Sequence, residues 1–168
     1  MTKTKILIIY TGGTIGMVAD ATTGVLMPFN FDQIIDNVPE LKRLDYKLVV
    51  HSFDPPIDSS DMTPDIWIEL AEIIEHKYHE FDGFVILHGS DTMAYTASAL
   101  SFMLEGLEKP VVFTGSQLPI NGTRTDAKEN LITAIEIAAD RKRGKAAVPE
   151  VCIYFDYKLF RGNRSIKC

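Results

Sequence analysis

The stretch Lys5-Ile-Leu-Ile-Ile-Tyr10-Thr-Gly-Gly-Thr14-Ile-Gly16 gives the first indication of the fold. An apolar run rich in β-branched residues passes directly into a glycine-rich turn, which is typical of a buried strand that ends in a loop. Similar runs recur along the chain. The segments expected as strands are Lys5–Tyr10, Lys47–Phe53, Gly83–His88, Pro110–Thr114 and Val151–Tyr157.

Segments with helical spacing of apolar residues separate these strands. The clearest has Thr63 as a candidate N-cap and Pro64 at the first helical position. Other helices are expected at Phe31–Asp36, at Glu40–Leu44, from Ser90 or Asp91 to Gly106, and after Asp126 as a cap. Alternating strands and helices predict a single-domain α/β fold of the Rossmann-like type: a doubly wound, mostly parallel sheet with helices on both faces.

Composition excludes several classes of protein. The chain has 168 residues, is 46% hydrophobic and carries a formal net charge of −6, which fits one globular domain and argues against nucleic-acid binding. The apolar runs are far shorter than the roughly 20 residues of a membrane span, and the first is too short for a signal peptide. Two cysteines and four scattered histidines predict no disulfide framework, metal site or cofactor. We therefore expect a cytoplasmic protein.

Small polar residues follow four of the predicted strands. Because ligands of such sheets bind beyond the carboxyl ends of the strands, these loops predict a pocket for a small, hydrogen-bonding molecule. Each residue also has an ordinary structural interpretation as a turn hydroxyl or a helix cap. The glycine-rich turn suits a dinucleotide phosphate less well, because it lacks the G-x-G-x-x-G spacing and a Walker lysine. The candidates are Thr14, Ser59, Ser60, Ser90, Asp91 and Ser116.

Considered together, the loop segments resemble a known family, the bacterial type I (cytoplasmic) L-asparaginases, in order and spacing. The resemblance runs from residue 5 to residue 168, and Thr11–Gly16 and His88–Ser98 are similar to that family's two signature patterns. It implies hydrolysis of L-asparagine to L-aspartate and ammonia through a β-acyl-enzyme, without a cofactor, in a homodimer or homotetramer. The segments that carry it are Tyr10–Gly16, Ser59–Met62, His88–Met93, Gly115–Pro119 and Arg161–Lys167.

The resemblance also implies a role for each candidate. Thr14 matches the nucleophile, and Ser90, Asp91 and Lys167 match a second group whose hydroxyl, carboxylate and amine assist the reaction. Ser59 and Asp91 match positions that hold the α-carboxylate and α-ammonium of the substrate. Ser60 lines the same pocket, and Ser116 matches a position near the side-chain amide.

The chemistry of these residue types agrees with such roles. An alcohol is a weak nucleophile at neutral pH, so a base must accept its proton. A lysine serves as that base only when burial or a nearby cation lowers its pKa, and Lys167 is therefore expected to be partly buried. A zwitterionic substrate calls for a carboxylate beside its ammonium. The backbone near Gly12, Gly13 and Gly89 offers N–H groups for the oxyanion.

The sequence departs from the family pattern in three places. Ser90 stands where the family usually has threonine, which keeps the hydroxyl but loses the methyl group that stiffens χ1. The segment Gly24-Val25-Leu26 has no counterpart of a tyrosine that some members carry there, so the group that activates Thr14 is open. The chain ends one residue after Lys167, whereas the family continues into a smaller C-terminal domain.

These departures leave the expectation of an asparaginase N-terminal catalytic domain at residues 1–168, without the C-terminal domain. A terminal segment is mobile unless it is tied down, so the geometry of Lys167 decides whether this domain turns over substrate alone. Two other hypotheses stay open. One is a non-catalytic remnant that binds an amino acid or a partner, and the other is the asparaginase-like subunit of a tRNA-dependent amidotransferase.

Overall fold

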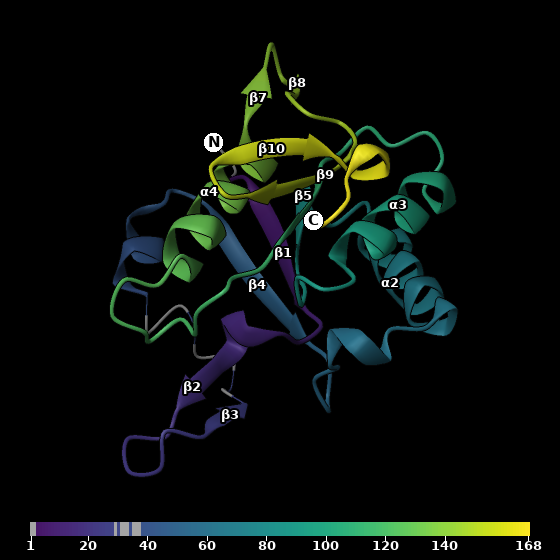
Figure 1. Cartoon of the computed structure of the whole chain (residues 1–168). Helices are drawn as coiled ribbons and strands as arrows, with labels where there is room; N and C mark the ends of the chain where they lie inside the picture. The colour runs from purple at the N-terminus through teal and green to yellow at the C-terminus, as the bar shows by residue number, and fades with distance from the viewer. Residues whose placement is uncertain (1–2, 29, 31–33, 35–37) are drawn as a thin grey trace.

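A six-stranded sheet in the order β10-β9-β6-β5-β1-β4 forms the centre of the molecule (Figure 1). The computed structural model describes residues 3–28, 30, 34 and 38–168. All strands but one are parallel to their neighbours; β10 alone runs antiparallel, alongside β9. The strands are β1 (Lys5–Tyr10), β4 (Lys47–Ser52), β5 (Gly83–Leu87), β6 (Val111–Thr114), β9 (Val151–Phe155) and β10 (Lys158–Arg161). The predicted α/β fold with a mostly parallel sheet is confirmed.

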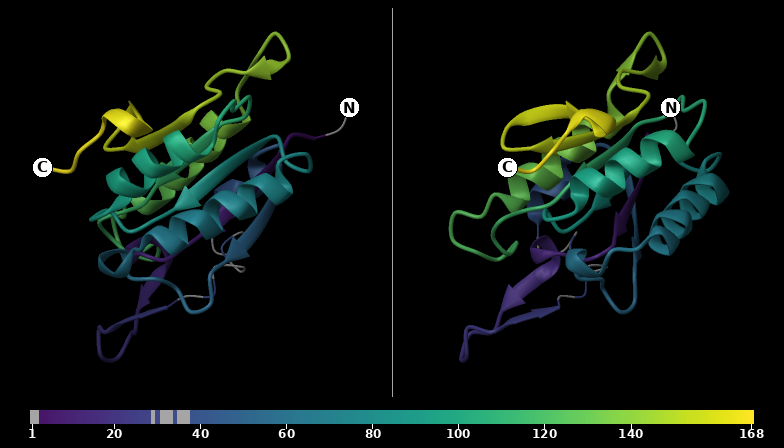
Figure 2. Two further views of the ribbon diagram at one scale, coloured as in Figure 1. Left: turned by 90° about the vertical axis from the view of Figure 1, so that its right-hand side faces the viewer. Right: turned by 45° about the vertical axis from the view of Figure 1, so that its right-hand side comes forward.

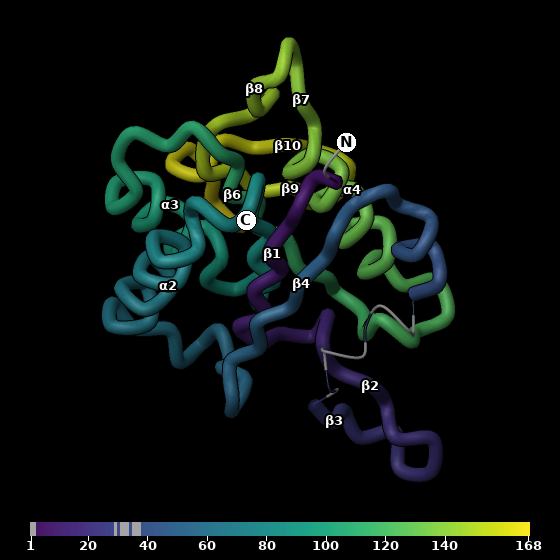
Figure 3. Tube along the Cα trace, turned by 180° about the vertical axis from the view of Figure 1, so that it is seen from behind, coloured from purple at the N-terminus to yellow at the C-terminus, as the bar shows by residue number. Residues whose placement is uncertain are grey.

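Helices cover both faces of this sheet, as expected for parallel strands that are apolar on both sides. Helices α2 (Pro64–Lys77) and α3 (Met93–Met103) pack on one face (Figures 1 and 2). Helix α4 (Ala127–Ala139) and the 3-10 helix η3 (Pro39–Arg43) lie on the other, as the view from behind in Figure 3 also shows. Alternate residues of β1 enter the two cores, Leu7 and Ile9 on the α2 side and Ile6, Ile8 and Tyr10 on the α4 side.

The order of the parallel strands locates the ligand-binding edge. From β1 the chain first adds β4 on one side, then crosses to β5 on the other side and continues through β6 to β9. This is the 2-1-3-4-5 order of a doubly wound sheet, whose direction of winding reverses between β1 and β5. Ligands of such sheets bind at that reversal. Thr14 and Ser90 follow the two strands that flank it.

Several predicted boundaries were wrong. The helix expected at Glu40–Leu44 is the short 3-10 helix η3, which begins at Pro39 and ends at Arg43. The helix expected at Phe31–Asp36 falls largely outside the described residues, so its bounds stay a prediction. Helix α3 begins at Met93, so Ser90 and Asp91 precede it instead of opening it. Its last residue is Met103, three residues before Gly106.

Strand β10 was not predicted, because the expected strand Val151–Tyr157 runs through a tight turn. Asp156 and Tyr157 adopt φ values of +50° and +57°, the geometry of a two-residue type I′ hairpin turn. The usual signal for this turn is a glycine, which Asp-Tyr lacks. The chain therefore turns back two residues earlier than expected, and Lys158–Arg161 adds the edge strand.

Two small hairpins project from opposite ends of the molecule (Figure 1). Strands β2 (Met17–Ala19) and β3 (Leu26–Pro28) form one beyond the carboxyl end of β1, and strands β7 (Arg141–Lys142) and β8 (Lys145–Ala146) form the other. In the described part of the chain, no helix has the length and apolar character that crossing a bilayer requires.

The close approach of β5 to helix α4 yields a stability prediction. A Cβ placed on Gly83 would lie 2.6 Å from the carbonyl oxygen of Ala138 and 3.2 Å from Ile6 Cδ1. Gly83→Ala is therefore expected to lower the free energy of unfolding by about 1–3 kcal/mol, as overpacking does in cores, and Gly83→Ser by more. Urea denaturation measures both. Gly122→Ala, in a loop where the nearest atom is 3.1 Å away, serves as the control, and an equal loss there would contradict the packing argument.

Candidate active site

Three loops at the carboxyl edge of the sheet meet at Gly89. A Cβ built on Gly13 would lie 2.7 Å from Gly89 Cα, and one built on Gly89 would lie 2.5 Å from Ser59 Oγ. Both distances are too short for real carbon contacts, so only glycine permits this approach. The loops that follow β1, β4 and β5 are therefore in direct contact, which brings Thr14, Ser59 and Ser90 to one place.

Thr14 opens the 3-10 helix η1 (Thr14–Gly16), immediately after Gly13, whose φ of +89° favours glycine. The ring of Tyr10 lies beneath this turn, because a Cβ on Gly16 would meet the Tyr10 hydroxyl at 2.2 Å. The hydroxyl donates a hydrogen bond to the Gly13 carbonyl at 3.4 Å. Burial raises the pKa of Tyr10 to about 12, so it stays protonated at neutral pH. Tyr10 supports the turn and is not a base for Thr14.

The two serines after β4 differ in their surroundings. Ser59 is buried at the start of the 3-10 helix η4 (Ser59–Asp61), and its carbonyl accepts a hydrogen bond from Thr92 Oγ1 at 2.7 Å. That bond ties this loop to the loop after β5. Ser60 is exposed, and its hydroxyl donates to Asp58 Oδ1 at 2.9 Å. Hydrogen bonds from Ser60 lower the pKa of the Asp58 carboxyl. The Ser60 side chain thus stabilises its own turn.

Ser90, Asp91 and Lys167 form one cluster. Lys167 Nζ donates to Ser90 Oγ at 2.9 Å and pairs with Asp91 Oδ1 at 2.5 Å. Ser90 and Asp91 are not the helix cap that their position suggested, because Thr92 occupies the N-cap of α3. Lys167 was expected to be partly buried, and 45% of its side chain is exposed.

The C-terminal segment reaches this cluster because a short helix anchors it. The 3-10 helix η5 (Gly162–Arg164) packs against α3 and β9, where a Cβ on Gly162 would lie 2.9 Å from both Ser101 Oγ and the Val151 carbonyl. Ser165 Oγ then donates to the Arg161 carbonyl at 2.8 Å. These contacts bring Lys167 to Ser90, which lies 77 positions earlier in the chain.

The loop after β6 carries Ser116 and is held by helix α4. Ser116 is buried, and its hydroxyl donates to the Leu118 carbonyl at 2.6 Å. The Asp126 carboxylate accepts from the backbone N–H groups of Gln117 and Leu118 at 2.9 and 3.1 Å. Asn130 Nδ2 donates to the Gly115 carbonyl at 2.8 Å. Asp126 occupies the N-cap position of α4, as predicted, but its side chain makes no capping hydrogen bond and instead fixes the loop.

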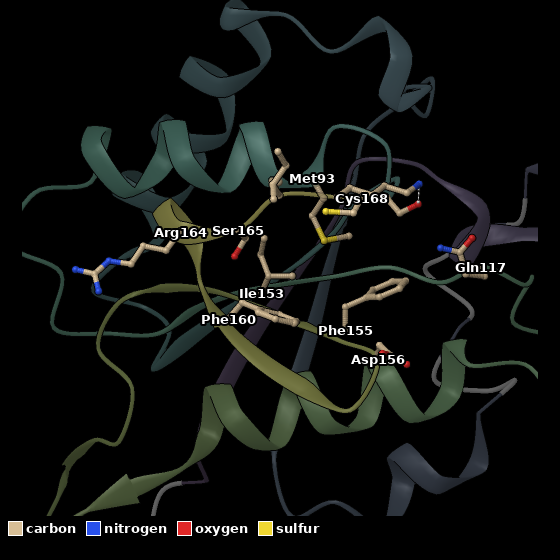
Figure 4. Close-up of a pocket in the computed structure, with 13 residues that line it drawn as sticks. Met93, Gln117, Ile153, Phe155, Asp156, Phe160, Arg164, Ser165 and Cys168 are labelled. Carbon is tan, nitrogen blue, oxygen red and sulfur yellow. Dashed lines mark hydrogen bonds between the residues drawn. The ribbon is translucent and has the colours of Figure 1, made fainter.

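A cavity of about 490 Å³ adjoins the Lys167 cluster (Figure 4). Ser90 and Lys167 lie at its wall, and its remaining lining is mainly apolar. Thr14, Ser59 and Ser116 do not line it. The candidates therefore form two groups, one around Gly89 and one around Lys167, joined through consecutive residues of one loop. The apolar side chains of the cavity include Met93, Ala94, Ile153, Phe155, Phe160 and Ile166.

Comparison with known proteins gives the family of this chain. The family model described as Asparaginase, N-terminal, matches residues 5–168. The chain belongs to the asparaginase family. It is 45% identical to L-asparaginase 1 of Escherichia coli (strain K12), over 99% of this chain and 48% of that protein.

Solved structures of the asparaginase family agree with this assignment. The crystal structure of L-asparaginase I from Vibrio cholerae superposes with a TM-score of 0.87 at 45% identity, covering 99% of this chain and 49% of that one. The "Probable Cytoplasmic L-asparaginase" from Campylobacter jejuni superposes with a TM-score of 0.79 at 32% identity, covering 95% and 46%. The chain thus spans about half the length of the relatives that it matches.

Sequence inspection did not identify Asp126, Asn130 and His88 as residues that support the site loops of this asparaginase-family chain. Asp126, the N-cap residue of α4, and Asn130 in its first turn lie four positions apart, a spacing that places two polar side chains on one side of the helix. His88 directly precedes the site loop and is fully buried, with Nδ1 2.7 Å from the Gly89 carbonyl and Nε2 2.9 Å from Thr96 Oγ1. A polar residue at the end of an apolar strand was the available signal.

Burial of His88 predicts a loss of stability in mild acid. Burial lowers its pKa below the ordinary value of 6.5. In mild acid the unfolded chain therefore binds a proton at His88 that the folded chain does not bind. As pH falls below about 6.5, the free energy of unfolding should decrease by up to about 1.4 kcal/mol per pH unit. Above that pH the residue contributes no pH dependence. Urea denaturation at pH 7.5 and 5.0 measures the effect, and His88→Asn should flatten it; an unchanged slope would contradict the assignment.

Proposed function

We propose that this chain is the N-terminal catalytic domain of an L-asparaginase, which hydrolyses L-asparagine to L-aspartate and ammonia. The observation that carries the proposal is the convergence of Thr14, Ser59 and the Ser90–Asp91–Lys167 cluster around Gly89. They meet at the point where the strand order reverses, in a chain of the asparaginase family. L-Asparaginase is also what the matched E. coli and V. cholerae proteins are named.

The proposed reaction proceeds in two steps. Thr14 Oγ attacks the side-chain amide carbon of asparagine and forms a C–O bond, and collapse of the tetrahedral intermediate breaks the C–N bond. The threonine proton leaves with the nitrogen as ammonia, and a β-acyl ester remains on Thr14. Water then attacks the ester, which releases aspartate and restores the hydroxyl. Backbone N–H groups near Gly12, Gly13 and Gly89 are the donors proposed for the oxyanion.

The remaining residues are proposed to hold the substrate and assist the transfer of protons. The Asp91 carboxylate faces the α-ammonium of the substrate, and Ser59 faces its α-carboxylate. Ser90 and Lys167 assist the reaction through the hydrogen bond between Lys167 Nζ and Ser90 Oγ. Ser116 is proposed to lie near the side-chain amide of the substrate. Ser60 is proposed to line the same pocket, and its hydroxyl stabilises the turn after β4.

The test is ammonia release from L-asparagine by the purified chain, measured beside L-aspartate binding by calorimetry. Release of ammonia with matching amounts of aspartate would support the proposal. Binding of aspartate without release would favour the non-catalytic alternative. A chain that neither binds nor hydrolyses would contradict both. The same assay on the chain joined to a C-terminal half of E. coli L-asparaginase 1 asks whether residues outside the chain complete the site.

We further propose that the protein acts as a homodimer or homotetramer in the cytoplasm. Large apolar side chains are exposed on α3, on the β9–β10 turn and beside Lys167, namely Phe102 at 70%, Tyr157 at 78% and Ile166 at 80%. Exposed apolar surface favours association. Sedimentation velocity is the measurement, and a monodisperse monomer would count against the oligomer. The name of the Campylobacter jejuni relative supports the cytoplasmic location.

A further inference from the structure

A chain of hydrogen bonds, buried at its centre, runs from helix α2 through helix α3 to the carbonyl oxygen of Gly89. Trp67 Nε1 lies 3.0 Å from Thr96 Oγ1, and that hydroxyl lies 2.9 Å from His88 Nε2. His88 Nδ1 lies 2.7 Å from the Gly89 carbonyl oxygen. Thr96 and His88 are both 0% exposed, so the hydrogen bond between them is shielded from water.

The position of each proton in this chain follows from what its groups can donate and accept. An indole N–H only donates, so the Thr96 oxygen accepts from Trp67. A carbonyl oxygen only accepts, so His88 Nδ1 carries the proton that binds Gly89. A neutral imidazole has one ring proton, which leaves Nε2 as an acceptor for the Thr96 hydroxyl. Burial lowers the pKa of His88, which agrees with a neutral ring.

The hydrogen bond from His88 to the Gly89 carbonyl oxygen restrains the backbone of the site loop. Glycine has more backbone freedom than any other residue, yet Gly89 is where the loops after β1, β4 and β5 meet. The hydrogen bond from His88 holds its carbonyl toward the imidazole. Because the peptide unit is planar and trans, the N–H of Ser90 points away from that ring. The direction of the chain into Ser90 and Asp91 is thereby set.

We propose that His88, held in one tautomer by Thr96 and Trp67, is a positioning residue for the hydrolysis. It fixes the Gly89–Ser90 peptide and, through it, the Ser90 hydroxyl and the Asp91 carboxylate. This inference rests on the proposed function, because it concerns the geometry of that same site. His88 itself touches neither the substrate nor the reacting atoms.

Two substitutions at position 88 separate positioning from simple filling of the core. The amide nitrogen of an asparagine lies where ring Nδ1 lies, whereas that of a glutamine lies nearer to Nε2. His88→Asn should therefore keep kcat within about threefold of the wild type, and His88→Gln should lower kcat by about 10- to 100-fold, because displacements near 1 Å have costs of that size. KM should change less than kcat. Equal losses in both variants, in step with lower melting temperatures, would overturn the proposal.

A spectroscopic measurement tests the hydrogen-bond chain without any turnover. Side-chain nitrogen NMR of His88 in the wild type should show a proton on Nδ1 and none on Nε2. Thr96→Val, which removes the hydroxyl at nearly constant volume, should shift the Nε2 resonance, because that nitrogen loses its hydrogen-bond donor. A wild type that shows the signature but releases no ammonia contradicts the proposed function. An active wild type with a proton on Nε2, or an active His88→Gln with unchanged kcat, contradicts the positioning role.

Discussion

Thr14→Ala is expected to lower the hydrolysis of L-asparagine by at least about 1,000-fold, while aspartate binding is largely retained. The substitution removes the only atom that forms the acyl bond in the proposed reaction, and loss of a nucleophile has effects of this size or larger. Thr14 is half-buried in a turn that Gly13 and Tyr10 shape, so its free energy of unfolding should change by less than about 1 kcal/mol. The measurement is steady-state ammonia release beside urea denaturation.

The matched control is Thr14→Ser, which keeps the hydroxyl and loses the methyl group. It should retain a measurable fraction of kcat, because the nucleophilic oxygen is still present although χ1 is freer. If Thr14→Ala kept more than about a tenth of the activity, the role of Thr14 would be wrong. Ser59 and Ser90 also place hydroxyls at the meeting of the loops, and because Lys167 Nζ contacts Ser90 Oγ, Ser90→Ala would then be the variant expected to lose activity.

Lys167→Met is expected to lower kcat by about 100-fold or more with little change in stability. Nζ contacts both Ser90 Oγ and Asp91 Oδ1, so its removal releases two groups that the proposed reaction uses. The side chains of the ion pair are 45% and 71% exposed, and exposed pairs contribute at most about 1 kcal/mol to folding. Ammonia release and melting temperature are measured together.

Lys158→Met is the matched control for Lys167→Met. Lys158 also forms an exposed ion pair, with Asp156 at 3.6 Å, but it makes no contact with Ser90 or Asp91. Its substitution should leave both kcat and stability unchanged. Equal activity in the two variants, or a fall in activity that follows the melting temperature, would show that Lys167 serves the fold alone. Lys167→Arg should not restore full activity, because a planar guanidinium replaces a compact ammonium.

Local patterns in the sequence were sufficient for most of the fold. Apart from Lys5 and Thr114 at their ends, the runs that became β1, β5 and β6 are apolar, because both faces of a parallel sheet are covered. Helix α2 begins at Pro64, as the spacing predicted. The predicted role of a side chain failed where a longer-range contact replaced a local one. Helix α4 begins directly after Asp126, as predicted, but the Asp126 carboxylate binds the backbone of Gln117 and Leu118 instead of capping its own helix.

The candidate site could be listed from the sequence but not assembled from it. The loop residues after each strand were predictable, because a parallel sheet brings the carboxyl ends of its strands to one edge. The glycines at 13 and 89 also had a visible local role as turn residues. Their contact with each other and with Ser59 was not visible, because it depends on how closely separate loops approach.

By itself, the sequence determined the α/β fold, the edge of the sheet where a ligand binds and the residue types available there, because these follow from periodicity and strand direction. Only the tertiary structure decided that Lys167 lies against Ser90 and Asp91, and that its side chain is half exposed. It likewise linked Trp67, Thr96 and His88 to Gly89. The physical reason is that hydrogen bonds between distant segments depend on packing of η5, α2 and α3 against the sheet, which no local pattern encodes.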